Sequence, residues 1–122
     1  MKQILICGSL FDSVDGTVKE NQAVVIEDNK IAQIVPKDQA PKDGEVIDLS
    51  DKFVMPGLID AHMHMNLSGQ ADFQNFFIQN TAAAITVQSI VNLQKDLLAG
   101  FTTIRDEGAY EFTDVAVRNA IA

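Results

Sequence analysis

Two histidines, His62 and His64, are the only histidines of this 122-residue chain, and one residue separates them. The residues from Leu58 to Met65 are mostly apolar and follow a Pro-Gly pair, which predicts a short strand entered through a turn. Side chains two apart on a strand point to the same face, so Asp60, His62 and His64 are expected to share one. Neutral imidazole is the commonest protein ligand of zinc-like metals. The pair therefore predicts half of a metal site.

The alternative interpretation is an accidental histidine pair on a half-exposed strand. Against it, a strand as apolar as Leu58 to Met65 is expected to be buried on both faces, where imidazoles without partners are costly. A catalytic zinc normally has three protein ligands, so two histidines alone predict weak binding. Asp60 is a candidate carboxylate for orienting a ligand histidine. Alternatively, backbone amides near the Pro-Gly turn satisfy Asp60.

The segment 54–64, Val-Met-Pro-Gly-Leu-Ile-Asp-Ala-His-Met-His, resembles the amidohydrolase superfamily. Those metal-dependent hydrolases carry an HxH pair at the end of their first barrel strand. The segment 97–106, Leu-Leu-Ala-Gly-Phe-Thr-Thr-Ile-Arg-Asp, is similar to the segment that follows in the imidazolonepropionase and prolidase-like branch. The resemblance covers nearly the whole chain and corresponds to the N-terminal portion of the family fold. It implies a TIM-type barrel with a small β-domain, and metal ligation by His62 and His64.

The resemblance also implies an activity, the hydrolysis of C–N bonds in small amide, cyclic amide or dipeptide substrates. One or two divalent ions, most commonly zinc, assist this reaction in the family. The other ligands there, a lysine that is often carboxylated, two histidines and an aspartate, come from later strands. A complete barrel needs about 200 to 250 residues. We therefore expect an incomplete barrel, and a chain that is inactive in isolation.

Three interpretations of the chain remain open at this stage. It is the N-terminal part of an amidohydrolase, or one chain of a split enzyme, or a non-catalytic module that binds a partner or a second copy of itself. An unpaired edge of the second barrel strand favours self-association or a complementing chain.

The elements that must position these residues fall into two regions, which meet near Pro56-Gly57. Residues 1–57 predict a small antiparallel β-domain, part of a composite β-sandwich. Its Asp28-Asn29 pair predicts a tight hairpin, because both residue types tolerate left-handed backbone conformations. Five short strands are expected in this region, over residues 4–7, 23–27, 30–35, 45–49 and 53–55.

Residues 58–122 predict alternating strand and helix, the first two βα units of a (β/α)8 barrel. After the strand that ends at His64, a loop with a helical turn is expected, then a helix stopped by Gly100. A strand over residues 101–104 and a final helix capped by Thr113 or Asp114 complete the pattern. The helical turn carries Phe73, Phe76 and Phe77, whose spacing is more typical of a core than of a substrate cage. The fold class is therefore mixed α/β.

Arg105 and Asp106 follow the second predicted barrel strand, at the edge that carries the chemistry in such barrels. They are candidates for anchoring a substrate or for orienting another group. Alternatively, an ion pair between them or with a neighbour fixes the loop.

Composition limits the classes of partner and location. The chain is 47% hydrophobic and 21% charged, which is ordinary for a soluble globular protein. Its net charge of −8, without any basic run, argues against nucleic acid and anionic membranes as partners. No apolar run approaches the roughly 20 residues of a membrane span. The single cysteine, Cys7, excludes an internal disulfide, favours the cytoplasm, and is expected to be a small buried hydrophobe.

Overall fold

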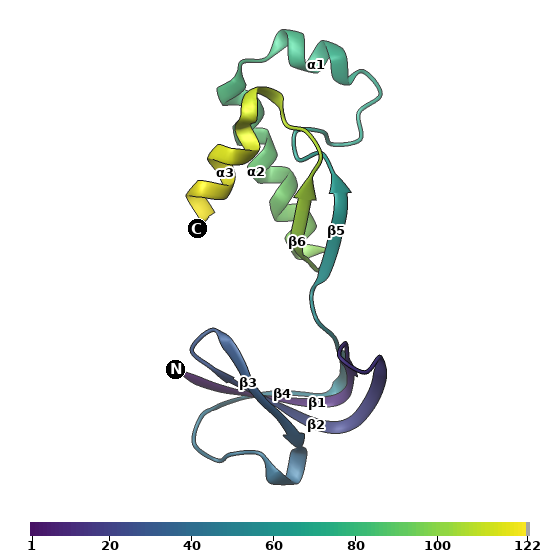
Figure 1. The fold of residues 1–122 in the computed structure, drawn as a ribbon, viewed down its shortest axis with the longest axis vertical. Helices are drawn as coiled ribbons and strands as arrows, with labels where there is room; N and C mark the ends of the chain where they lie inside the picture. The colour runs from purple at the N-terminus through teal and green to yellow at the C-terminus, as the bar shows by residue number, and fades with distance from the viewer. Residues whose placement is uncertain (122) are drawn as a thin grey trace. The chain divides into compact units, whose positions relative to one another are not determined.

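The structure is a computed structural model, and it describes residues 1–121. The chain divides into two compact units, one from Met1 to Pro56 and one that begins at Gly57. Figure 1 shows a β-sheet in the first unit, and strands together with helices in the second. The mixed α/β class predicted from the sequence is therefore confirmed. Within residues 1–121, no helix has the length and apolar character needed to cross a membrane.

The first unit is a four-stranded sheet with the order β3-β2-β1-β4. Two antiparallel hairpins join β1 to β2 and β2 to β3. The predicted turn at Asp28-Asn29 is confirmed, and Asp28 takes a left-handed φ of 58° there. Its elements are β1 (Lys2–Asp12), β2 (Thr17–Glu27), β3 (Lys30–Pro36), the short 3-10 turn η1 (Lys37–Gln39) and β4 (Glu45–Val54).

One face of this sheet carries an apolar core, in which Cys7, Leu10 and Val24 are buried. Cys7 is a free thiol, and its burial confirms the prediction of a small buried hydrophobe. Leu5, Ile26 and Val54 pack against these three side chains and are partly buried.

Two predictions for the first unit are wrong: the sheet is not fully antiparallel, and it has four strands instead of five. The chain leaves β3 at one edge and enters β4 at the other, so β4 runs parallel to β1. The polar segment Ser50 to Lys52 forms an irregularity within β4 where a turn between two strands was expected. Its residues lie opposite Gly8, between the pairs Cys7–Leu49 and Ser9–Phe53.

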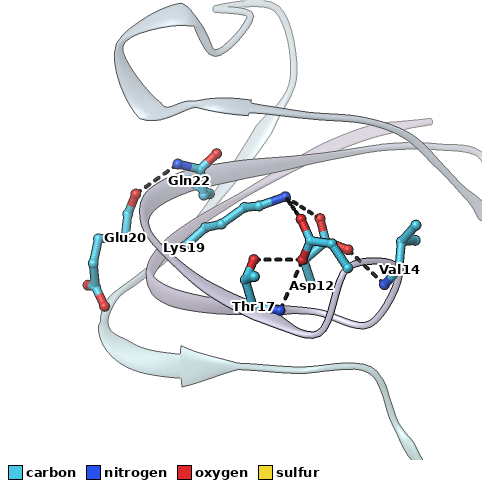
Figure 2. Close-up of polar contacts among 7 residues, drawn as sticks. Asp12, Val14, Thr17, Lys19, Glu20 and Gln22 are labelled. Atoms are coloured by element: carbon cyan, nitrogen blue, oxygen red, sulfur yellow. Dashed lines mark hydrogen bonds and ion pairs between the residues drawn. The ribbon is translucent and has the colours of Figure 1, made fainter.

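A polar cluster closes the loop between β1 and β2, and Figure 2 shows its members pointing toward one another. Asp15 accepts hydrogen bonds from the backbone N–H and the hydroxyl of Thr17, at 3.0 and 2.6 Å. Lys19 reaches both carboxylates of the loop, with Nζ 2.5 Å from Asp12 Oδ2 and 2.9 Å from Asp15 Oδ2. The backbone N–H of Val14 donates to the other oxygen of Asp12.

In the second unit, a parallel pair of strands is connected through helices. The elements are β5 (Leu58–Met63), α1 (Phe73–Gln79), α2 (Ala82–Leu98), β6 (Phe101–Asp106), the 3-10 turn η2 (Tyr110–Phe112) and α3 (Thr113–Ile121). β5 and β6 are parallel neighbours, and α2 makes the crossover between them and packs against β6 and α3 (Figure 1). The predicted order of strands and helices is therefore confirmed, including the helical turn that carries the three phenylalanines.

Side chains and a glycine fix the ends of these helices. Asp72 accepts from the backbone N–H of Asn75 at the start of α1, and Thr81 accepts from that of Ala84 at the start of α2. Gly100, with a φ of 102°, follows α2 and allows the chain to turn into β6.

Two predictions for β5 need correction. The strand ends at Met63 and not at Met65, because the chain turns at His64, whose carbonyl accepts from the N–H of Leu67 at 3.0 Å. The strand is also not buried on both faces, and Ile59 is 67% exposed. Only one other strand pairs with β5 in the part of the chain that the structure describes, so too few elements surround it for two-sided burial.

Candidate metal centre

A groove of about 470 Å³ runs along β5, the loop that follows it and the C-terminal half of α2. Asp60, His62 and His64 all line it, so the three residues predicted to share a face do open onto one space. Asn92, Lys95 and Asp96 contribute the wall from α2.

The two imidazoles stand edge to face, with ring centroids 5.6 Å apart and ring planes 83° from each other. The Nδ1 of His64 lies 3.1 Å from the carbonyl oxygen of Gly108. A carbonyl can only accept, so Nδ1 carries the proton and the lone pair of Nε2 is left free. Histidines that bind metals usually donate their other ring N–H in this way, which makes His64 suitable as a ligand through Nε2.

His62 is exposed in this structure, so the argument from burial of both imidazoles does not apply to it. Its backbone N–H donates to Asp60 Oδ1 at 3.0 Å. Asp60 therefore makes the backbone contact considered from the sequence, and no bond from it to either ring is found within residues 1–121. A role for Asp60 in orienting a ligand histidine stays a prediction.

Arg105 and Asp106 do not pair with each other and do not line the groove of the histidines. Arg105 is an exposed side chain whose Nε lies 2.9 Å from Glu107 Oε1, the neighbouring ion pair considered from the sequence. Asp106 instead accepts two backbone hydrogen bonds. The N–H of Met65 donates to Oδ2 at 3.0 Å, and the N–H of Gly108 donates to Oδ1 at 2.8 Å.

Beneath the site lies a buried polar cluster that the sequence reasoning missed. Asn66, 1% exposed, donates to Ser89 Oγ at 2.7 Å and to Thr113 Oγ1 at 3.1 Å, and its Oδ1 accepts from the backbone N–H of Tyr110. Asn92 donates to the carbonyl oxygens of Met65 and Leu67, at 2.9 and 3.3 Å. The loop after β5 is thus held to α2 and to the start of α3.

The signal for this cluster was present in the helix pattern. Ser89 and Asn92 lie four and seven residues after Ile85, which places all three on one face of α2. That face is the buried one. Polar residues on the apolar face of a helix indicate buried hydrogen-bonding partners elsewhere in the chain.

The donor set fits a metal ion in part. Among residues 1–121, no group of three or more histidine, cysteine, aspartate or glutamate side chains is arranged to hold a metal. His62 and His64 offer two imidazole nitrogens on one groove, and the contact of His64 Nδ1 with the carbonyl of Gly108 favours a free Nε2. The described residues therefore supply two ligand positions of a site that needs more.

The histidine pair lies where a parallel strand ends, which is the edge that carries the active site in α/β barrel enzymes. Comparison with known proteins confirms the resemblance to the amidohydrolase superfamily. No family model matches the chain. An allantoinase of Streptomyces avermitilis is 31% identical over 84 residues, which are 67% of this chain and 19% of that protein. An imidazolonepropionase of Salmonella heidelberg is 41% identical over 51 residues, 41% of this chain and 12% of that protein.

The structural comparison agrees with the sequence comparison. The crystal structure of a Xaa-Pro dipeptidase with methionine bound in its active site superimposes with a TM-score of 0.87 and 28% identity. The match covers 99% of this chain and 30% of the dipeptidase. The chain thus spans about a fifth or less of the two curated relatives and less than a third of the solved structure. Within those limits it corresponds to the N-terminal portion of amidohydrolase-superfamily proteins.

Proposed function

We propose that this chain forms the first part of a metal-dependent amidohydrolase that cleaves C–N bonds, with His62 and His64 as two of its metal ligands. The observation that carries the proposal is the hydrogen bond from His64 Nδ1 to Gly108, which leaves Nε2 free on the groove that His62 also lines. Zinc is the proposed ion, because imidazole nitrogen is one of its preferred ligands. The complete site would hold one or two ions.

The two regions of the chain have separate places in this proposal. Residues 1–57 form the small β-domain, and residues 58–122 open a (β/α)8 barrel. Two observations favour the proposed barrel. β5 and β6 are parallel strands connected through the helix α2, and a further helix, α3, follows β6.

The chemistry divides between the chain and the ion. A divalent ion at the histidine pair would polarise the scissile carbonyl and activate water. The residues of this chain orient the imidazole of His64 through Gly108, hold the loop after β5 through Asn66 and Asn92, and form one wall of the groove. The proposed substrates are amides, cyclic amides or dipeptides, which the names allantoinase, imidazolonepropionase and Xaa-Pro dipeptidase of similar proteins support. Hydrolysis would need ligands beyond these two histidines, so the 122 residues alone are proposed to be inactive.

Metal titration tests the histidine pair directly. The purified chain is titrated with Zn²⁺ by calorimetry, alongside His62→Ala, His64→Ala and, as the matched control, Asn119→Ala, an exposed residue of α3. We expect the chain and the control to bind one ion weakly, because only two ligands are present, and neither histidine variant to bind it. Equal binding by all four proteins would contradict the proposal, because the ion would then be held elsewhere.

A second candidate is a chain that completes its barrel by pairing with another polypeptide or with a second copy of itself. The observation that favours it is the exposure of large apolar side chains on β5 and α2, among them Leu58, Ile59, Val87, Val91 and Leu98. A two-stranded sheet is also marginal by itself. Light scattering of the purified chain tests this candidate, which predicts a mass above that of one chain, and a monomer would contradict self-association.

A cytoplasmic location and the absence of nucleic-acid partners are part of the proposal. Cys7 is the single cysteine, and burial raises the pKa of its thiol, so it is a poor nucleophile. A lone unreactive thiol is compatible with a reducing compartment. The net charge of −8 disfavours binding to phosphate backbones.

A further inference from the structure

We propose that Asp106 is a positioning residue that determines which nitrogen of His64 is free to bind a metal, a role that rests on the proposed function of the histidine pair. Asp106 acts through the backbone of Gly108 and not by contact with the ring. The structural part of the proposal is three hydrogen bonds, which join Met65 to Asp106, Asp106 to Gly108 and Gly108 to His64.

The carboxylate of Asp106 connects the loops that follow the two parallel strands. Its Oδ2 accepts from the N–H of Met65, the residue directly after His64, at 3.0 Å. Its Oδ1 accepts from the N–H of Gly108 at 2.8 Å. Hydrogen bonds to an ionised carboxylate are stronger than those between neutral groups, so this side chain holds both loops in a fixed relation.

Gly108 transmits this constraint to the imidazole. With its N–H bound to Asp106, its carbonyl oxygen lies 3.1 Å from His64 Nδ1. Its φ of 154° is one that residues with a side chain rarely adopt. A Cβ at this position would lie 4.0 Å from His64 Cε1, so this residue lies beside the ring. Asp106 therefore holds the N–H of Gly108, and the carbonyl of the same residue acts as the acceptor for His64.

The consequence for the metal site is the choice of tautomer. A neutral imidazole carries one proton on either nitrogen, and only the other nitrogen has a lone pair for a metal. A fixed carbonyl at Nδ1 holds the proton there and leaves Nε2 available. Without Asp106, the peptide of Gly108 loses one of the bonds that place it, while the N–H of Glu107 still donates to Met63 and that of Tyr110 to Asn66. We therefore expect the proton of His64 to move in part from Nδ1 toward Nε2.

The tautomer can be measured without any metal. The ring ¹⁵N chemical shifts of His64 are recorded in the metal-free chain at about pH 8, where imidazole is neutral. We expect His64 to be protonated at Nδ1 in the wild-type chain and to shift toward protonation at Nε2 in Asp106→Asn. Glu107→Gln is the matched control, because it removes the exposed ion pair with Arg105 on the same loop and leaves the Asp106 contacts in place. A wild-type ring protonated at Nε2 overturns the proposal.

Zn²⁺ affinity is the second readout. Replacing groups that orient a metal ligand typically costs 10- to 100-fold in affinity, and we expect a loss of about 10-fold for Asp106→Asn, with no loss for Glu107→Gln. An Asp106→Asn chain that keeps the wild-type tautomer and affinity overturns the proposal. If His62→Ala and His64→Ala bind Zn²⁺ as the wild-type chain does while the tautomer still changes in Asp106→Asn, the proposed function fails and the positioning role stands.

Asp106→Glu keeps the experiment decisive if Asp106→Asn does not fold. Glutamate retains two acceptor oxygens, so it is expected to preserve protonation at Nδ1 at least in part, as a positioning role by the carboxylate requires. A folded Asp106→Glu chain in which His64 is protonated at Nε2, with both loops otherwise unchanged in their amide spectra, overturns the proposal.

Discussion

Phe77 and Tyr110 stack face to face, with ring centroids 5.3 Å apart and ring planes within 9° of parallel. Phe77 belongs to α1, which follows β5, and Tyr110 begins η2, which follows β6. Phe73 and Phe76 also lie against Phe77, with centroids 6.4 and 5.7 Å away. Phe77 therefore attaches α1 to the turn after β6. None of the three phenylalanines is buried, so the core role expected for them is not found in this structure.

Tyr110→Ala is expected to loosen α1 while the strands remain intact. Aromatic pairs contribute about 0.5–1.5 kcal/mol beyond the area they bury, and α1, with seven residues, is too short to be stable by itself. Amide hydrogen exchange measures the effect, and we expect faster exchange over α1 and unchanged exchange over β5. Phe112→Ala is the control, since Phe112 lies in the same turn and is 79% exposed. Unchanged protection of α1 in Tyr110→Ala would contradict the anchoring role.

Asn66→Ala is expected to be strongly destabilising. The substitution leaves the N–H of Tyr110 without its acceptor and removes the hydrogen bonds that the Asn66 amide donates to Ser89 and Thr113. Each buried polar group left unsatisfied costs about 1–3 kcal/mol, so a loss of about 2–4 kcal/mol is expected. Urea unfolding measures it, with exposed Asn75→Ala as the control. A loss below about 1 kcal/mol would show that water replaces these bonds.

How far the sequence predicts this fold depends on the range of the interactions involved. The helix from Ala82 to Leu98 and the strand that begins at Phe101 were predictable, because hydrophobic periodicity and Gly100 are local signals. The parallel pairing of β4 with β1 was not, because the edge at which a returning strand joins a sheet is decided by contacts distant in sequence. Likewise, the polar residues at 50–52 indicated a turn, yet the sheet absorbs them opposite Gly8.

The candidate site shows the same division. The spacing of His62 and His64 predicted that both open onto one space, and both line the groove. The partner of each polar side chain was not predictable. Arg105 and Asp106 are adjacent in sequence, but one pairs with Glu107 and the other binds backbone amides. Hydrogen bonds between loops 41 or 44 residues apart in the chain, such as those from Met65 to Asp106 and from His64 to Gly108, leave no periodic pattern in a single sequence.

Gly8→Ala is expected to disrupt the pairing of β1 with β4. A Cβ at this position would lie 2.4 Å from the carbonyl oxygen of Ser50 and 3.1 Å from that of Lys52, and backbone atoms cannot move aside as a flexible side chain does. Overpacking of this kind costs about 1–3 kcal/mol. Hydrogen exchange over β4 measures the effect. Gly16→Ala is the control, because a Cβ there meets open space, and its cost comes from a φ of 72° alone. Full protection of β4 in Gly8→Ala would contradict this prediction.

The loop between β1 and β2 is expected to make the first unit sensitive to acid, and Lys19→Met is expected to reduce that sensitivity (Figure 2). Hydrogen bonds from Thr17 and then from Lys19 lower the pKa of Asp15 from 3.8 to about 2, and Lys19 also lowers the pKa of Asp12. A carboxyl whose pKa is lower in the folded state stabilises that state above its unfolded pKa, and the contribution is lost as pH falls through the folded pKa. The stability of the wild-type chain should therefore fall between about pH 4 and pH 2.

The stability of Lys19→Met should be lower than that of the wild-type chain at neutral pH. Its decline between about pH 4 and pH 2 should be smaller, because only the hydrogen bonds from Thr17 and the backbone still favour the ionised carboxylates. Urea unfolding midpoints, followed by the loss of β-sheet circular dichroism at each pH, provide the measurement. The control is Lys52→Met, since Lys52 pairs only with its exposed neighbour Asp51, at 2.8 Å. Exposed pairs of this kind contribute little, so the control should follow the wild-type curve. Parallel curves for Lys19→Met and the wild-type chain down to about pH 2 would show that Lys19 is not coupled to these carboxylates.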